Sequence, residues 1–236
     1  QKESEIRVDS ENKERKGCPH FDEENQNTDK KEEIGTSILI AGLGNRLVTP
    51  DALGPQVADN LYITRHIIKE FGRRAYENEQ VQSISAIVPG VMAQTGMETM
   101  EIIRGVIRET DPDAVIAIDA LAARSVRRLN CTIQITDTGI NPGSGVCNHR
   151  YGLNEETLGI PVIGIGVPTV VDGATIVHDA IAHLLENLEE AEMEEFLQEL
   201  ITPRLHRMFV TPKDVDETVK RLSYTISEGI NIAMEA

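Results

Sequence analysis

The chain has 236 residues, of which 40% are hydrophobic and 3% aromatic, so it can form one large α/β domain with an aliphatic core. Its formal net charge of −16 argues against nucleic acid and against an anionic membrane as direct partners. Three cysteines without CxxC spacing favour a reducing compartment over a disulfide framework or a zinc site. Because no apolar run is long enough to span a membrane, we expect a soluble, intracellular protein.

The first 34 residues differ from the rest of the chain. They are dense in Glu, Lys, Asp and Asn and lack the periodicity of a helix or strand. Such segments cannot bury enough apolar surface to fold by themselves. We predict a polar, mobile N-terminal arm over residues 1–34 and a single α/β domain over residues 35–236.

The stretch that follows predicts a strand, a sharp turn and a helix. Residues 37–43 are an apolar, partly β-branched run typical of a buried strand, and Gly44 allows a sharp turn. Thr49-Pro50-Asp51 has the pattern of a helix start, with Thr49 as N-cap and a carboxylate in the first turn. This pattern predicts a helix to about Glu70. Asp51 would then lie just beyond the carboxyl end of a central strand, where open α/β sheets bind ligands.

Strands and helices alternate along the rest of the chain. Apolar runs predict strands over 81–88, 114–118, 132–136 and 161–166, and helical spacing predicts helices over 98–107, 121–129, 174–188, 192–201 and 215–233. The 132–136 run alternates polar and apolar residues, as a strand near the sheet edge does. Residues 137–153 form a long loop rich in Gly, Asn, Ser and Pro. The alternation predicts an α/β/α sandwich.

Asp119 directly follows the predicted strand over 114–118. It would emerge into the same crevice as Asp51. Burial would raise the pKa of Asp119, whereas the helix N-terminus would lower that of Asp51, and such a pair suits general acid/base catalysis. One carboxylate would activate water while the other protonates the leaving group or stabilises the oxyanion. The alternative is structural, with each aspartate only stabilising the start of a helix.

Other chemistries have weaker support. Gly42-Leu43-Gly44 resembles a dinucleotide-binding turn, but Leu47 stands where the third glycine belongs. The histidines are scattered without metal-ligand spacing, and Gly143-Ser144-Gly145 lacks the frame of a nucleophile elbow. Cys147 could be a reactive thiol, but no base accompanies it in the sequence. We therefore predict neither a bound metal nor a cofactor.

Long motifs are spread over about residues 36–234. They include GLGN at 42–45, VTPDALGP at 48–55, VPGVM at 88–92, TGMET at 95–99, IDALAARS at 118–125, DTGI at 137–140, PGSGV at 142–146 and GIPVI at 159–163. Together they resemble the germination protease family of spore-forming bacteria.

The resemblance implies an unusual aspartic endopeptidase that degrades small acid-soluble spore proteins during germination. The two family aspartates fall on Asp51 and Asp119. Members are homotetramers, made as zymogens that lose an N-terminal propeptide, so the expected location is the cytoplasm of the forespore and the spore core. The implied fold is that of hydrogenase maturation endopeptidases, a three-layer α/β/α sandwich with a mixed, mostly parallel five-stranded sheet. Residues 132–136 would be its antiparallel strand.

Two alternatives stay open. The related maturation enzymes are metal-dependent endopeptidases on the same fold, although no residue of this sequence can be matched to their metal-binding histidine. The chain could also be a non-catalytic binding protein in which both aspartates only cap helices. Chelation would distinguish the first alternative, and an absence of any activity would distinguish the second.

Overall fold

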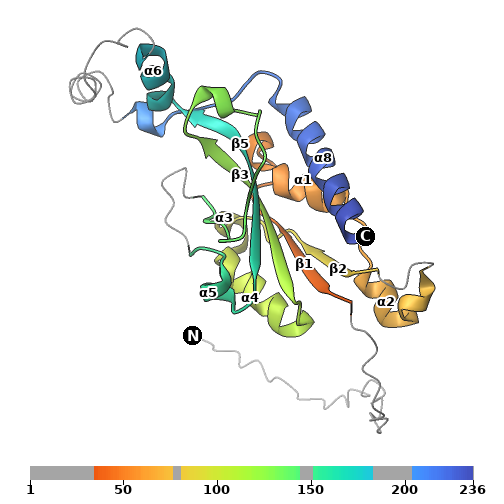
Figure 1. Ribbon diagram of the computed structural model, residues 1–236. Helices are drawn as coiled ribbons and strands as arrows, with labels where there is room; N and C mark the ends of the chain where they lie inside the picture. The colour runs from red at the N-terminus through yellow and green to blue at the C-terminus, as the bar shows by residue number, and fades with distance from the viewer. Residues whose placement is uncertain (1–34, 77–80, 144–150, 183–203, 236) are drawn as a thin grey trace, which may run out of the picture. The chain divides into compact units, whose positions relative to one another are not determined.

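The computed structural model describes residues 35–76, 81–143, 151–182 and 204–235, which are built around a mixed, mostly parallel sheet (Figure 1). Within these residues the sheet has the order β2-β1-β3-β5-β4, and β6 also pairs with β5. Its strands are β1 (Ser37–Gly42), β2 (Ser83–Ile87), β3 (Ala114–Ala123), β4 (Gln134–Thr136), β5 (Val162–Asp172) and β6 (Phe209–Val210). β4 and β6 run antiparallel to β5, whereas the other pairings are parallel.

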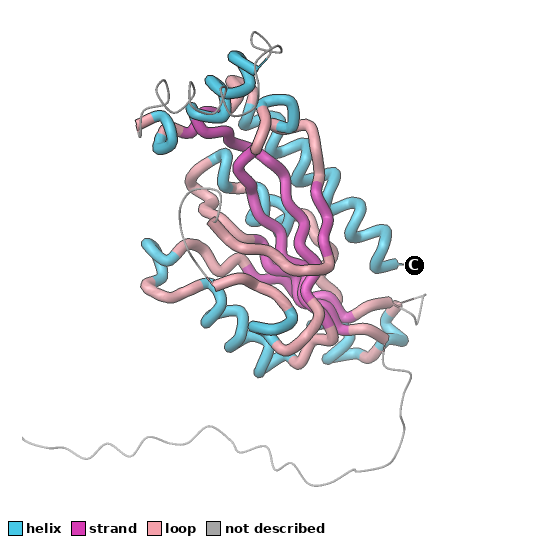
Figure 2. Tube along the Cα trace, turned by 60° about the vertical axis from the view of Figure 1, so that its left-hand side comes forward, coloured by secondary structure: helices cyan, strands magenta, loops and turns pink. Residues whose placement is uncertain are grey.

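Helices lie on either side of the strands (Figure 2). The α-helices are α1 (Leu53–Asp59), α2 (Arg65–Phe71), α3 (Met92–Thr95), α4 (Thr99–Thr110), α5 (Glu155–Leu158), α6 (Gly173–Ala182) and α8 (Val215–Glu235). Short 3-10 turns are η1 (Thr49–Asp51), η2 (Arg73–Ala75), η3 (Val126–Arg128) and η5 (Leu205–Arg207).

Alternation along β1 divides the core between the two faces of the sheet, because successive strand side chains point in opposite directions. Ile40 belongs to a cluster that contains Leu53 of α1 and Val219 of α8. Leu39 belongs to a second cluster that contains Ile103 of α4 and Leu158 of α5. The predicted three-layer α/β/α sandwich is therefore confirmed, and so is the antiparallel direction of the strand predicted over 132–136.

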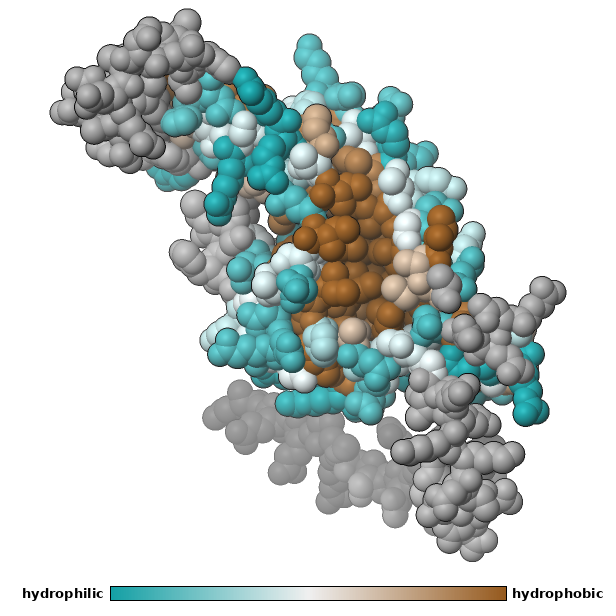
Figure 3. Space-filling view, viewed as in Figure 1, coloured by the Kyte–Doolittle hydropathy of each residue, from teal (hydrophilic) through white to brown (hydrophobic). Residues whose placement is uncertain are grey.

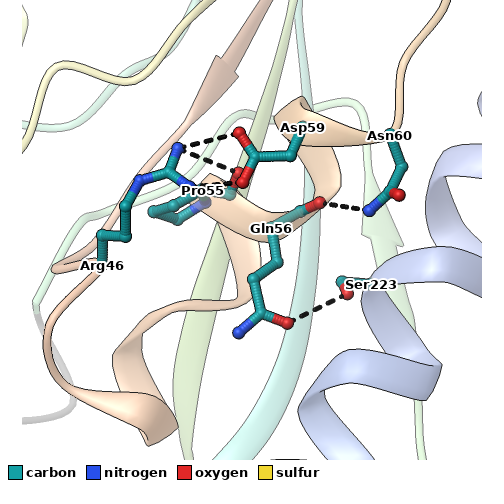
Figure 4. Close-up of polar contacts among 6 residues, drawn as sticks. All are labelled: Arg46, Pro55, Gln56, Asp59, Asn60 and Ser223. Atoms are coloured by element: carbon teal, nitrogen blue, oxygen red, sulfur yellow. Dashed lines mark hydrogen bonds and ion pairs between the residues drawn. The ribbon is translucent and has the colours of Figure 1, made fainter.

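The two helices on the first face are also joined by polar contacts. Ser223 of α8 donates a hydrogen bond to the side-chain oxygen of Gln56 in α1 at 3.4 Å (Figure 4). At the end of α1, the Asn60 side chain donates to the Gln56 carbonyl at 2.7 Å. The first of these contacts joins α8 to α1, and the second closes the last turn of α1.

The sheet has one strand more than the five predicted. The additional strand, β6, has only two residues and pairs through Val210 with Val171 of β5. Two residues are too short for the alternation by which a strand is recognised in a sequence.

The helix predicted over 121–129 is wrong. β3 does not end at Asp119 but continues to Ala123, and the only helical turn in the 121–129 stretch is η3. β5 likewise continues beyond its predicted end, to Asp172, and pairs with the additional residues of β3. The alanines of this stretch favour a helix, but hydrogen bonding to a long neighbouring strand outweighs that preference.

The single helix predicted from Thr49 to Glu70 is also wrong, since this stretch forms η1, α1 and α2. η1 begins at Thr49 itself and its N-cap position is occupied by Val48, so Thr49 is not an N-cap. α1 and α2 are separated because Asn231 of α8 accepts from the Tyr62 N–H at 3.0 Å and donates to the Asn60 carbonyl at 3.1 Å. These contacts replace helical hydrogen bonds in the break.

Several predictions fall outside the described residues. They concern the arm over 1–34, Cys147, the helix over 192–201 and the end of the helix over 174–188, which is described as α6 as far as Ala182. Among the helices that the structure describes, none combines the length and the apolar composition needed to cross a lipid bilayer.

Candidate active site

A pocket of about 790 Å³ lies where β1 ends and β3 and β5 continue. The segment after β1, the second half of β3 and the corresponding part of β5 all contribute to its lining. Asp51 and Asp119 are both among the lining residues. The structure thus brings together the two carboxylates that the sequence analysis selected, from segments that are 68 positions apart (119 − 51).

Asp51 is the last residue of η1, and its carboxylate is held from the preceding loop. Its Oδ2 accepts a hydrogen bond from the Asn45 N–H at 2.7 Å. Thr169 of β5, which is 1% exposed, donates its hydroxyl to the Pro50 carbonyl at 2.6 Å. Thr211 in turn donates its hydroxyl to the Thr169 carbonyl at 2.9 Å. The turn that carries Asp51 is therefore fixed to the sheet.

Asp119 lies within β3 and is 4% exposed. Its register partner in β5 is Gly166, and its Oδ1 accepts a hydrogen bond from the Ala120 N–H at 2.9 Å. A side chain on a paired strand of the sheet has little positional freedom. The site therefore combines one carboxylate on a short turn with one on a rigid strand.

Gly44 allows the chain to pass close to Asp51. It has φ +109°, a conformation that other residues rarely adopt, and a Cβ there would lie 2.0 Å from the Asp51 carbonyl oxygen. The same Cβ would lie 3.2 Å from Asp51 Oδ1. The sequence indicates a sharp turn at Gly44, but not that the turn closes on the carboxylate.

An ion pair ties the loop after β1 to the end of α1. Arg46 donates two hydrogen bonds to the Asp59 carboxylate, one of them at 3.0 Å, and both side chains are about half exposed (Figure 4). The hydrogen bond to Asp59 raises the pKa of Arg46. Neither residue lines the pocket, so the pair supports the loop without contributing to the site.

Three long polar side chains in the lining were not selected from the sequence: Arg124, Arg128 and Gln134. The turn between Arg124 and Arg128 is held by Asp179 of α6, whose Oδ2 accepts from the Val126 N–H at 2.7 Å and from the Ser125 hydroxyl at 3.0 Å. The run of arginines was visible in the sequence. The helix predicted over 121–129, however, gave no reason to expect these side chains in the same pocket as Asp119.

The described residues offer few metal ligands. Within residues 35–76, 81–143, 151–182 and 204–235, no group of three His, Cys, Asp or Glu side chains is placed to hold a metal ion. The described lining of the pocket contains two aspartates and no histidine. Cys147, in the loop after Gly143, lies outside the described residues.

Comparison with known proteins identifies the family. The germination protease family profile matches residues 3–188, well over half of the chain. The chain belongs to the germination protease family. Germination proteases of Caldanaerobacter subterraneus and Bacillus subtilis are 46% and 41% identical to it, over 215 and 245 aligned positions. Each alignment covers 84% of this chain and 66% of the relative, so the chain spans just under two thirds of the length of these relatives.

Two solved structures are also similar to the chain. A [NiFe] hydrogenase maturation protease HycI from Thermococcus kodakarensis has a TM-score of 0.42 and 19% identity, with 85% of this chain and 94% of that chain covered. The hydrogenase maturating endopeptidase HybD from E. coli has a TM-score of 0.33 and 16% identity, with 75% and 98% covered.

Proposed function

We propose that this member of the germination protease family is an endopeptidase that uses Asp51 and Asp119 as an acid/base pair. The observation that carries the proposal is their convergence in one pocket, from the turn after β1 and from β3. Capping alone does not account for Asp119, because it lies within a strand and no helix begins beside it. Carboxylates in one concave site are a common arrangement for hydrolysis.

The reaction needs one ionised and one protonated carboxyl group. The ionised group accepts a proton from a water molecule, whose oxygen attacks the carbonyl carbon of the scissile peptide bond. The protonated group donates a hydrogen bond to the developing oxyanion and then gives its proton to the leaving nitrogen. The C–N bond breaks, and the products are a new carboxyl terminus and a new amino terminus.

The substrates we propose are small acid-soluble spore proteins, hydrolysed in the spore core when the spore germinates. The family to which the chain belongs supports this choice, as do its relatives from Bacillus and Clostridium that are named germination proteases. A net charge of −16 disfavours direct binding to DNA and is compatible with a protein substrate. We place the protein in the cytoplasm of the forespore and the spore core.

We further propose that the protein is a homotetramer made as a zymogen, with residues 1–34 as an arm and residues 35–236 as the peptidase domain. Hydrophobic residues gather over the central strands on the face shown in Figure 3. Ile135 of β4 is 70% exposed and Ile163 of β5 is 38% exposed. Exposed apolar side chains that gather on one face are typical of an interaction surface, and we assign this surface to the proposed tetramer.

The test is digestion of a purified small acid-soluble spore protein by wild type, Asp51→Asn and Asp119→Asn, with and without EDTA. Asp216→Asn is the matched control, because it changes an exposed carboxylate in the first turn of α8, outside the pocket. We expect cleavage by wild type and control, none by the two pocket variants, and no effect of EDTA. Circular dichroism of each variant establishes that it is folded.

The other outcomes identify the alternatives. Loss of cleavage in EDTA, restored by added metal, would establish the metal-dependent mechanism. If the folded wild type cuts no protein substrate, either as the full chain or after limited proteolysis of residues 1–34, the peptidase proposal fails and a binding protein remains. Full activity of either pocket variant would show that the pair is not the catalytic machinery.

A further inference from the structure

β3 extends beyond the end of β1, and this extension begins at Asp119. β1 pairs with β3 only as far as Gly42, opposite Ile118, and the Leu43 N–H makes the last contact, to the Ile118 carbonyl at 2.8 Å. β3 then continues from Asp119 to Ala123, paired with β5 on its other side. Among the described residues, no strand pairs with the β1 side of this extension.

The free edge opens into the pocket. Ala120, Leu121 and Ala122 line it together with Asp119, and Asp51 lines it as well. Residues along a strand direct their backbone groups alternately to the two sides. Because the Ile118 carbonyl points toward β1, the backbone groups of Ala120 and Ala122 point to the same side. The register with β5 shifts between Leu121 and Ala122, but the extra residue, Thr169, lies in β5, so the alternation along β3 is kept.

One of these groups is already used within the chain, since the Ala120 N–H donates to Asp119 Oδ1. In the part of the chain that the structure describes, no backbone hydrogen bond on this side is found for the Ala120 carbonyl or for either backbone group of Ala122. An open strand edge of this kind is a template on which another chain can add as a strand.

We propose that the protein substrate binds in an extended conformation, as an additional strand along the β1-side edge of residues 120–123. This binding mode rests on the proposed function and specifies how the candidate active site binds its substrate. A strand added there continues the line of β1 past Asp119, which brings a substrate carbonyl between Asp119 and Asp51. Main-chain hydrogen bonds provide affinity, and side chains on alternate substrate residues provide selectivity.

The test uses the intact protein and chemically altered substrates. The wild type first cuts a small acid-soluble spore protein, and the cut site is mapped by mass spectrometry. Short synthetic peptides spanning that site are then made, each with one backbone N-methyl group at a successive position outside the scissile bond. N-methylation removes a donor and adds bulk on one side of an extended chain.

If the substrate binds as a strand beside β3, the effect of N-methylation on kcat/KM should alternate from one peptide position to the next. Methylation at every second position on one side of the cut should lower kcat/KM by about tenfold, the scale of one lost hydrogen bond together with a steric clash. The positions between should stay within about threefold of the unmodified peptide. If the peptides are cut but kcat/KM does not alternate with the position of the methyl group, strand addition is overturned and the peptidase proposal stays intact. If the wild type cuts no protein at all, the peptidase proposal fails and this inference fails with it.

Discussion

Replacing Gly44 with alanine tests whether the turn beside Asp51 has the geometry on which the site depends. The new Cβ would lie 2.0 Å from the Asp51 carbonyl oxygen, and real Cβ atoms essentially never approach another atom within 3.0 Å. The clashing atom belongs to the backbone, so no side-chain rotation relieves the contact. Either the loop at Gly44 or η1 must move.

The expected cost has two parts. A non-glycine residue at φ +109° costs about 1–3 kcal/mol in backbone strain. Insertion of a methyl group into a closely packed contact costs about 1–3 kcal/mol more. We therefore expect Gly44→Ala to lower the free energy of unfolding by about 2–6 kcal/mol and, in the molecules that remain folded, to displace Asp51 and reduce cleavage.

Urea unfolding followed by circular dichroism measures the first effect. Gly105→Ala is the matched control, because Gly105 lies in α4 with no atom within 4 Å of its added Cβ. Alanine inside a helix should stabilise the protein by about 0.5–1 kcal/mol. If Gly44→Ala unfolds within about 1 kcal/mol of wild type and keeps full activity, the close approach of Gly44 to Asp51 is not part of the native site.

Three further substitutions test the surroundings of the site. Thr169→Val removes the hydroxyl that holds the part-buried Pro50 carbonyl, which should cost about 1 kcal/mol in urea unfolding and lower kcat. Unchanged values for both would contradict the role of this bond. Leu53→Ala leaves a cavity at a fully buried position under α1 and should lower the free energy of unfolding by about 2–5 kcal/mol, as measured by thermal unfolding. A loss below about 1 kcal/mol would show that α1 does not pack as described. Arg46→Ala breaks the half-exposed ion pair with Asp59 and should lower the free energy of unfolding by no more than about 1 kcal/mol, and by less at high salt. A large loss that does not depend on salt would contradict a surface ion pair.

The sequence was sufficient to predict the layers of the fold and the meeting of two carboxylates. Both predictions rest on local patterns, namely apolar runs that mark buried strands and a carboxylate that follows each run. Asp51 and Asp119 lie at one pocket because their strands are neighbours in the sheet. The antiparallel direction of β4 was likewise consistent with its alternating residues.

Features that depend on distant partners could not be predicted in this way. The alanines after Asp119 favour a helix, and only the extension of β5 alongside them makes them a strand. The break between α1 and α2 depends on Asn231, at the far end of the chain. Arg124 and Arg128 reach the pocket because Asp179 holds the turn between them, a contact across more than fifty residues that no local pattern contains.

The central claim is that Asp51 and Asp119 act together. The most direct test is to measure kcat for Asp51→Asn, for Asp119→Asn and for the double variant. Circular dichroism establishes that each variant is folded. Acid/base groups typically contribute about 10²–10⁴-fold to a rate, so each single change should lower kcat by that amount. Because the two groups serve one proton transfer cycle, the double variant should be little slower than either single variant. A single variant that keeps kcat within about threefold of wild type, or a double loss equal to the product of the single losses, would contradict joint catalysis by this pair.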